Sequence, residues 1–156
     1  MLTPAKKSKI RASGGAFAII ASRYNARYVD AMVKAAREQL KEGGAQKISV
    51  IRVPGAFEIP AVASRLASST PAWSAIICLG VIVRGQTSHA QLIAEAVSLS
   101  LAQLQTQRAL PVIHEVLLLE NEAQAMVRCL DKKHNRGAEA AQTALEMAQV
   151  MESLPE

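Results

Sequence analysis

Short apolar runs and longer segments of helical period alternate along the chain, with glycine, proline or polar residues between them. Residues 16–22 and 75–83 are almost entirely apolar, which is typical of strands buried on both faces. Residues 47–53 alternate between apolar and polar, and residues 111–119 form another mainly apolar run. The pattern therefore predicts four strands.

The segments between these strands carry apolar residues at helical spacing. Gly43 and Gly44 end the first such segment. Helices are predicted at 26–42, from the PGAFEIP segment to about Ser69, at 89–107, at 120–130 and at 138–152. In the helix 89–107, the residues expected to face inward are Leu92, Ile93, Ala96, Val97, Leu101 and Leu104.

Strands that alternate with helices predict an α/β chain. The expected architecture is a single-domain, three-layer sandwich in which a parallel four-stranded sheet is flanked by helices. Residues 1–13 are expected to form a flexible basic tail and residues 14–156 the domain. In such sheets ligands bind at the carboxyl ends of the strands, where the chemically distinctive segments of this chain also fall.

The net charge of +5 comes almost wholly from the N-terminal segment, which holds Lys6, Lys7, Lys9 and Arg11. From residue 12 onward, 14 basic residues nearly balance 13 acidic ones, so nucleic acid is not an expected partner. Two cysteines form no disulfide framework, and no apolar run reaches the roughly 20 residues that span a bilayer. We expect a cytoplasmic protein that does not bind membranes.

The segment RGQTSH, residues 84–89, stands at a strand-to-helix turn. Gly85 permits close approach of a ligand, and the free N–H groups of a helix start attract anions. Thr87 and Ser88 are either further donors or ordinary helix caps. His89 is either a proton-transfer group or a surface residue, and its ordinary pKa suits proton transfer near neutrality.

Two further segments combine aromatic and polar residues at strand ends. In VPGAFEIP, Glu58 either accepts hydrogen bonds from a ligand or favours the helix start, and Phe57 either lines a site or packs in the core. Tyr24, in SRYN, is one of only five aromatic residues. A flat heterocycle could stack on its ring, or the ring could pack at the edge of the sheet.

Four charged or titratable residues follow the third strand. Arg128 and Arg136 are candidates for bidentate phosphate binding, although, taken singly, Arg128 is better explained as a charge at a helix end and Arg136 as a solvated loop residue. His114 and Glu115 lie within a strand, where burial of charge is costly. We expect either an exposed strand end, or that these residues face a pocket or a neighbouring subunit.

Five segments, in order, resemble the signature stretches of the lumazine synthase family. They are SRYN, VPGAFEIP, GVIVRGQTSH, PVIHEVLLLENEAQA and HNRGAEAAQTALEM, and the resemblance runs from about residue 16 to residue 150. It implies a flavodoxin-like fold and condensation of 5-amino-6-(ribitylamino)uracil with 3,4-dihydroxy-2-butanone 4-phosphate to 6,7-dimethyl-8-ribityllumazine. Phosphate and water are released, and no metal or organic cofactor is needed. The reaction is the penultimate step of riboflavin biosynthesis, and the members of the family are transferases.

The resemblance also implies roles for individual residues. Tyr24 stands where the family usually has Phe or Trp. The residues implied to bind the substrate ring and ribityl chain are Tyr24, Asn25, Ala56, Phe57, Glu58, Val81, Ile82, Val83 and His114. Those implied to bind phosphate are Gln86, Thr87, Arg128 and Arg136, and His89 is the implied proton-transfer residue.

Besides Tyr24, and Gln86 where the family often has Ala, Ser or Glu, three positions depart from the family pattern. His114 replaces a common Phe that lines the ring pocket from the neighbouring subunit, Glu115 replaces a common Gly, and Arg136 replaces the usual Lys. These departures affect the expected substrate affinity more than the expected reaction.

The family pattern implies homo-oligomers built on pentamers, with sites between adjacent subunits, and riboflavin synthase as a candidate partner. Two other functions are compatible with the same residues. One is an archaeal-type riboflavin synthase, and the other is a protein that binds or encloses lumazine or flavin without catalysis. The arginines and the RGQTSH turn favour a substrate that bears phosphate.

Overall fold

The computed structural model describes residues 14–156, so the predicted tail at 1–13 lies outside the described residues. The four strands are β1 (Ala16–Ser22), β2 (Lys47–Val53), β3 (Ala75–Val83) and β4 (Val112–Leu119). They form one parallel sheet in the order β2-β1-β3-β4. All four predicted strands are confirmed, with the start of β4 one residue later than predicted.

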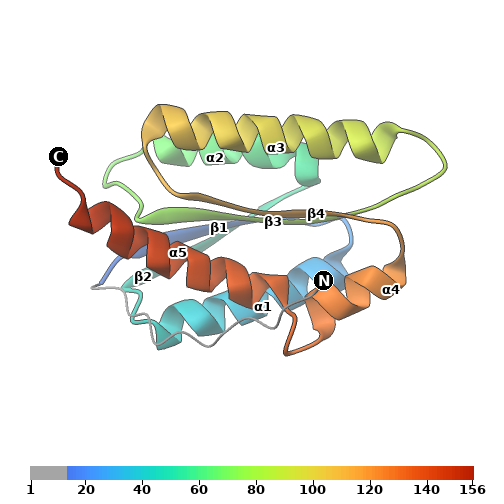
Figure 1. Cartoon of the computed structure of the whole chain (residues 1–156), viewed down its shortest axis with the longest axis horizontal. Helices are drawn as coiled ribbons and strands as arrows, with labels where there is room; N and C mark the ends of the chain where they lie inside the picture. The colour runs from blue at the N-terminus through green and yellow to red at the C-terminus, as the bar shows by residue number, and fades with distance from the viewer. Residues whose placement is uncertain (1–13) are drawn as a thin grey trace.

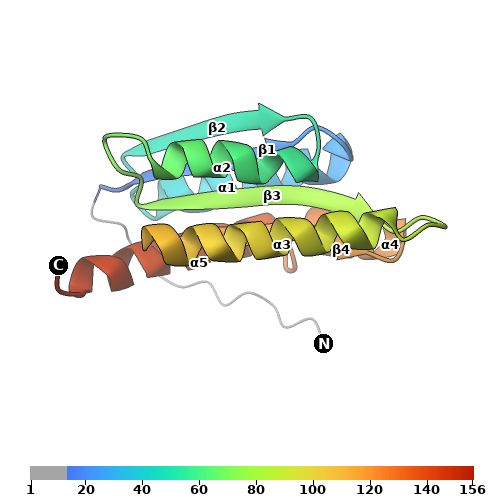
Figure 2. The ribbon, with the colours of Figure 1, turned by 90° about the horizontal axis from the view of Figure 1, so that it is seen from above.

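Helices cover both faces of the sheet (Figure 1). The helical elements are α1 (Ala26–Glu42), the 3₁₀ turn η1 (Ala56–Glu58), α2 (Ile59–Ala67), α3 (His89–Arg108), α4 (Glu122–Ala125), the π-helical turn η2 (Met126–Leu130) and α5 (Arg136–Ser153). Helices α2 and α3 lie side by side over one face (Figure 2), and α1, α4 and α5 cover the other. The predicted three-layer α/β sandwich is confirmed.

The core is divided by the sheet into two apolar clusters. On the side of α1 and α5, Phe17 and Ile19 of β1 pack with Met32 and Leu145. On the side of α2 and α3, the alternate strand residues such as Ile20 pack instead. The period of two along each strand therefore supplies both layers, which explains why the buried strands appear as continuous apolar runs.

The order of the strands reverses between β1 and β3. The chain places β2 on one side of β1 and β4 on the far side of β3. Such a switch point opens a crevice at the carboxyl ends of the strands. Here β1 pairs with β3 only as far as Leu79, whereas β4 follows β3 to Val83. The last residues of β3 therefore project beyond β1.

Three local predictions are corrected by the structure. Helix α5 begins at Arg136 rather than 138, because Asn135 Oδ1 accepts hydrogen bonds from the N–H groups of Gly137 and Ala138. The predicted helix 120–130 is divided into α4 and η2. Leu92 and Ala96, both expected to face inward, are exposed, and Leu92 is 61% exposed. No helix within residues 14–156 combines the length and apolarity needed to cross a membrane.

Candidate active site

An open pocket of about 720 Å³ lies at the carboxyl ends of β1, β2 and β3, beside the first turns of α3. Nine of the residues predicted for the site line it: Tyr24, Asn25, Ala56, Phe57, Glu58, Val81, Ile82, Val83 and His89. These residues come from four segments that the switch point brings together. Gly55, Leu92, Ile93 and Ala96 complete the lining.

Two aromatic side chains at the pocket are unusually exposed. Tyr24 is 70% exposed and Phe57 is 61% exposed, and each follows the end of a different strand. Gly55 allows the Tyr24 ring to lie close, because a Cβ at residue 55 would stand 2.9 Å from Tyr24 Cδ2. The rings are therefore available to a flat ligand rather than to the core.

Asn25 joins the end of β1 to the end of β3. It adopts the left-handed conformation, with φ of 58°, which asparagine tolerates better than most residues. Its Nδ2 donates a hydrogen bond of 2.6 Å to the carbonyl oxygen of Val81. This contact sets the position of the SRYN turn against the part of β3 that lines the pocket.

The projecting end of β3 offers main-chain groups to a ligand. Val81, Ile82 and Val83 pair with β4 on one side, but β1 no longer accompanies them on the other. Apart from the Val81 carbonyl held by Asn25, this edge of β3 carries no hydrogen bond to a neighbouring strand. Main-chain donors and acceptors at such an edge can recognise the polar rim of a heterocycle.

Glu58 is the acidic residue of the pocket lining. Its Oε2 accepts a hydrogen bond of 2.9 Å from the Gly55 N–H, which closes the turn η1. This interaction confirms that Glu58 stabilises the start of the helical segment. It also holds the carboxylate at the pocket, where it can accept hydrogen bonds from ligand hydroxyl groups.

The RGQTSH segment forms the exposed turn that leads into α3. His89 is the first residue of α3 and lines the pocket, and its N–H donates to Thr87 Oγ1 at 3.4 Å. Gln86 and Thr87 lie in the same turn, but outside the pocket lining. A Cβ added at Gly85 would meet no atom within 4 Å, so the turn is open to solvent.

Arg84 stabilises this turn through two side-chain hydrogen bonds. Its Nε donates to Glu120 Oε1 at 3.0 Å, and its Nη2 donates to Gln91 Oε1 at 2.8 Å. These bonds connect the end of β3 to the segment after β4 and to α3. The arginine of the turn thus has a structural role.

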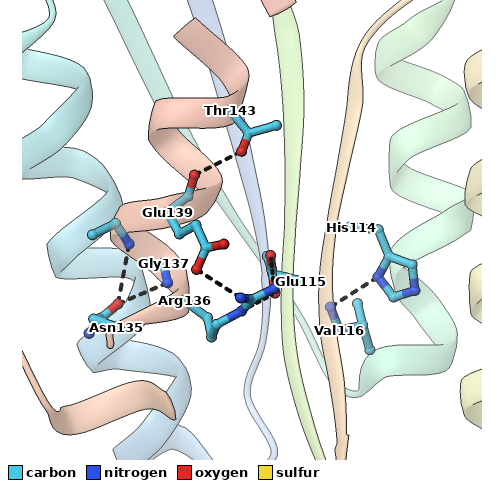
Figure 3. A network of polar contacts seen from close by, with 9 residues as sticks. His114, Glu115, Val116, Asn135, Arg136, Gly137, Glu139 and Thr143 are labelled. Carbon is cyan, nitrogen blue, oxygen red and sulfur yellow. Dashed lines mark hydrogen bonds and ion pairs between the residues drawn. The ribbon is translucent and has the colours of Figure 1, made fainter. Parts of the chain in front are cut away.

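The other predicted residues, His114, Arg128 and Arg136, lie outside this pocket. All three guanidinium nitrogens of Arg136 are engaged, because Nε and Nη2 donate to Glu115 and Nη1 donates to Glu139 (Figure 3). No ion pair to Arg128 occurs within residues 14–156. Of the two arginines, Arg128 is therefore the one whose guanidinium group is not held by a carboxylate within residues 14–156.

His114 and Glu115 extend to opposite faces of β4 (Figure 3). The exposed His114 ring contacts Ser98 of α3, whereas Glu115 is buried beside Arg136. Burial raises the pKa of Glu115 above its usual range, and the charge of Arg136 opposes that rise. His114 is therefore exposed, as the first expectation for this strand had it, whereas Glu115 lines no part of the pocket and instead pairs with Arg136 inside the chain, a pairing that was not predicted from the sequence.

The cysteines do not belong to the site. Burial raises the pKa of Cys78 to about 12 and that of Cys129 to about 11, so both thiols are protonated at neutral pH. Neither residue lines the pocket. Within residues 14–156, no group of three or more His, Cys, Asp or Glu side chains is placed to hold a metal ion.

Comparisons with known proteins match nearly the whole chain. Residues 14–152 match the family model of 6,7-dimethyl-8-ribityllumazine synthase. A protein of that name from Xanthomonas euvesicatoria pv. vesicatoria (strain 85-10) is 43% identical over 148 residues, which cover 94% of this chain and 96% of the relative. One from Desulfotalea psychrophila is 38% identical over 150 residues, covering 95% and 96%. One from Xylella fastidiosa (strain M12) is 40% identical over 148 residues, covering 94% and 96%.

Proposed function

Because the chain belongs to the 6,7-dimethyl-8-ribityllumazine synthase family, we propose that it joins 5-amino-6-(ribitylamino)uracil to 3,4-dihydroxy-2-butanone 4-phosphate. The product is 6,7-dimethyl-8-ribityllumazine, and phosphate and water are released. The chain is an enzyme, a transferase of riboflavin biosynthesis. The observation that carries the specific proposal is the pocket in which nine predicted residues meet.

The pocket suits the pyrimidine substrate. The exposed rings of Tyr24 and Phe57 provide flat surfaces for the heterocycle, and the edge of β3 provides main-chain groups for its polar rim. Glu58 accepts hydrogen bonds from the ribityl chain, and Ala56 leaves room beside it. Asn25 keeps the SRYN turn and β3 together, so both surfaces are set before the substrate binds.

The reaction requires proton transfer in several successive steps. The primary amine of the pyrimidine attacks the ketone and loses water to form an imine, phosphate is then eliminated, and the second amine closes the ring with loss of another water. His89, at the pocket and at the start of α3, takes up and returns the protons of these steps. It is the only histidine among the pocket-lining residues of the described chain.

The phosphate group binds beyond His89, at the N-terminus of α3. There the free N–H groups of the helix start and the side chains of Gln86 and Thr87 act as donors. Arg128 supplies the cation. Arg136, also predicted as a phosphate ligand, is already held by two carboxylates, and its geometry does not support that role.

We place the site between adjacent subunits of a cytoplasmic homo-oligomer built on pentamers. Tyr24, Phe57 and Leu92 leave an apolar surface around the pocket that a neighbouring subunit would cover. His114 and Arg128 lie outside the pocket of their own chain, as expected if they act in a neighbour's site. Riboflavin synthase, which would consume the product, is a candidate partner.

The first test is a steady-state assay with both substrates that follows lumazine absorbance or fluorescence. Product formation that depends on the butanone phosphate supports the proposal. Binding of the pyrimidine without product would instead indicate a protein that holds lumazine or flavin. Formation of riboflavin from lumazine alone would indicate a riboflavin synthase. Native mass spectrometry of the same sample tests for pentamers.

Two variants separate the proposed roles. His89→Ala should lower kcat by about 10²-fold or more while leaving binding of a ring analogue nearly unchanged. Arg128→Ala should raise the KM for the butanone phosphate far more than that for the pyrimidine. Unchanged turnover of His89→Ala, or equal changes in both KM values for Arg128→Ala, would contradict the respective role.

A further inference from the structure

Both ring nitrogens of His114 form hydrogen bonds within the chain. Nδ1 lies 3.1 Å from the backbone nitrogen of Val116 (Figure 3), and Nε2 lies 2.7 Å from Ser98 Oγ of α3. Because a backbone N–H can only donate, Nδ1 must be the acceptor and carry no proton. The neutral ring therefore has its proton on Nε2, from which it donates to Ser98.

This pair of bonds also favours the uncharged ring. An imidazolium carries a proton on each nitrogen, so it could no longer accept the hydrogen bond from Val116. Partial burial of the ring, whose outer surface stays exposed, acts in the same direction and lowers the pKa of His114 below its ordinary value. At neutral pH the ring is therefore neutral, and a single tautomer satisfies both partners.

Because both nitrogens of the His114 ring are hydrogen-bonded, only the flat face of the ring is free to contact another molecule. The side chain is exposed at β4, the edge strand of the sheet. With both nitrogens engaged, His114 cannot act as an acid, a base or a metal ligand without losing a contact. Its remaining surface is an uncharged aromatic face, which suits packing against another flat ring.

We propose that Ser98 is a positioning residue that holds His114 as a fixed aromatic face for the ring of the pyrimidine substrate. The inference rests on the proposed function, in which His114 faces the pocket of an adjacent subunit. Ser98 does not line the pocket of its own chain, so its effect passes through His114. The hydroxyl of Ser98 is thus a determinant of affinity for the pyrimidine.

Kinetics of the full-length oligomer test this role. Ser98→Ala should raise the KM for the pyrimidine about three- to tenfold, with a much smaller effect on kcat and on the KM for the butanone phosphate. Ser98→Thr keeps the hydroxyl and should restore most of the affinity. Ser100→Ala is the matched control, because Ser100 is exposed on the same helix and has no hydrogen bond to His114.

A double-mutant comparison separates positioning from general damage to α3. In a His114→Phe background, Ser98→Ala should change the pyrimidine KM less than twofold, because the ring that Ser98 holds is absent. If Ser98→Ala had the same effect in both backgrounds, Ser98 would act independently of His114 and the proposal would fail. An unchanged KM in Ser98→Ala alone would also overturn it.

Histidine ¹⁵N NMR at pH 7.5 gives a readout that does not need turnover. His114, assigned from the signals lost in His114→Phe, should show the Nε2–H tautomer in both the wild type and Ser98→Ala, because the Val116 N–H fixes Nδ1 as the acceptor. The Nε2 resonance should shift in Ser98→Ala, because its hydrogen bond to Ser98 is lost. A cationic ring or the Nδ1–H tautomer in the wild type would overturn the proposal. Absence of product from the wild type with both substrates would instead overturn the proposed function, which keeps the two failures distinct.

Discussion

Among the ion pairs of residues 14–156, the one between Glu115 and Arg136 should cost the most stability when a single partner is removed. The Glu115 side chain is only 10% exposed, and both of its oxygens accept hydrogen bonds from Arg136, at 2.9 and 3.1 Å. We consider the variant Arg136→Met, which keeps much of the side-chain volume but removes the cation. The carboxylate of Glu115 is then buried without a partner.

The expected loss follows from the burial of the two partners. Removal of one partner from a fully buried pair costs about 3–5 kcal/mol, because a charge is left desolvated. The Arg136 side chain is 28% exposed, so water can partly solvate the remaining carboxylate. We therefore expect the free energy of unfolding at pH 8 to fall by about 2–3 kcal/mol.

The loss should depend on pH. Burial already raises the pKa of Glu115, and removal of Arg136 takes away the charge that opposes this rise. The folded variant then binds the Glu115 proton more tightly than the unfolded chain does. Its stability deficit should be full above the raised pKa of the folded state, and should shrink as the pH falls through that pKa toward the ordinary value.

Two control variants isolate the buried charge. Glu139→Gln removes the other, more exposed partner of Arg136, and should cost only about 0.5 kcal/mol. Arg136→Met combined with Glu115→Leu removes both charges and should recover most of the stability. Urea unfolding at pH 5.5 and 8, at one fixed protein concentration because subunit association adds to stability, measures all the variants.

Equal losses for Arg136→Met and Glu139→Gln would refute the reasoning, since one leaves a buried charge and the other does not. So would a double variant that is less stable than Arg136→Met alone. A deficit that does not change between pH 8 and 5.5 would show that packing of the Arg136 side chain, rather than its charge, accounts for the loss.

Two further stability predictions concern backbone positions. Gly137→Ala should lower the free energy of unfolding in urea by about 3 kcal/mol, because its Cβ would stand 2.1 Å from the carbonyl oxygen of Met32 and α5 would have to move away from α1. Gly85→Ala is the control, because Gly85 lies in open space, and its free energy of unfolding should change by no more than about 0.5 kcal/mol. Similar losses in the two variants would contradict the prediction. Asn25→Ala should lower the free energy of unfolding by about 2 kcal/mol, because alanine strains the left-handed backbone and cannot form the hydrogen bond to Val81. Asn25→Gly should lose about half as much, because glycine also lacks the hydrogen bond but adopts the left-handed backbone without strain. Equal losses would assign the whole effect to the hydrogen bond.

The order of elements could be predicted because the buried strands are short and apolar throughout. Residues 16–22, 47–53 and 75–83 match β1, β2 and β3 to the residue. The start of α5 could not be read from the pattern, because its cap, Asn135, stands in a charged segment that suggests a loop. The π-helical turn after α4 carries no distinct pattern, since its period differs from that of an α-helix by a fraction of a residue.

Helical spacing also misplaced Leu92. It falls on the apolar side of α3 by period, but the first turns of α3 extend past the core and border the pocket. A periodic pattern shows which residues share a face, but not what that face meets. An exposed leucine on such a face therefore indicates contact with a ligand or a neighbouring subunit. Its exposure could be recognised only from the fold.

The grouping of residues at the pocket was predictable where they follow the end of a strand. Parallel strands bring their carboxyl ends to one edge, so Tyr24, Phe57 and His89 could be grouped although they are far apart in sequence. His114 and Glu115 could not be placed in this way, because adjacent residues of one strand face opposite sides of a sheet. Their partners, on α3 and α5, depend on the packing of the layers.

The charges around the pocket divide the proposed site into two halves. Within residues 14–156, no Lys or Arg lines the pocket, and the nearby Arg84 is held by Glu120 and Gln91. Among the described residues, the ring half therefore has no Lys or Arg side chain to bind phosphate. In the proposed site, the positive charge that stabilises the phosphate must then come from the N-terminus of α3 and from a cation outside the pocket. This division is why a change at Arg128 should affect the butanone phosphate, while changes at Ser98 or His114 should affect the pyrimidine.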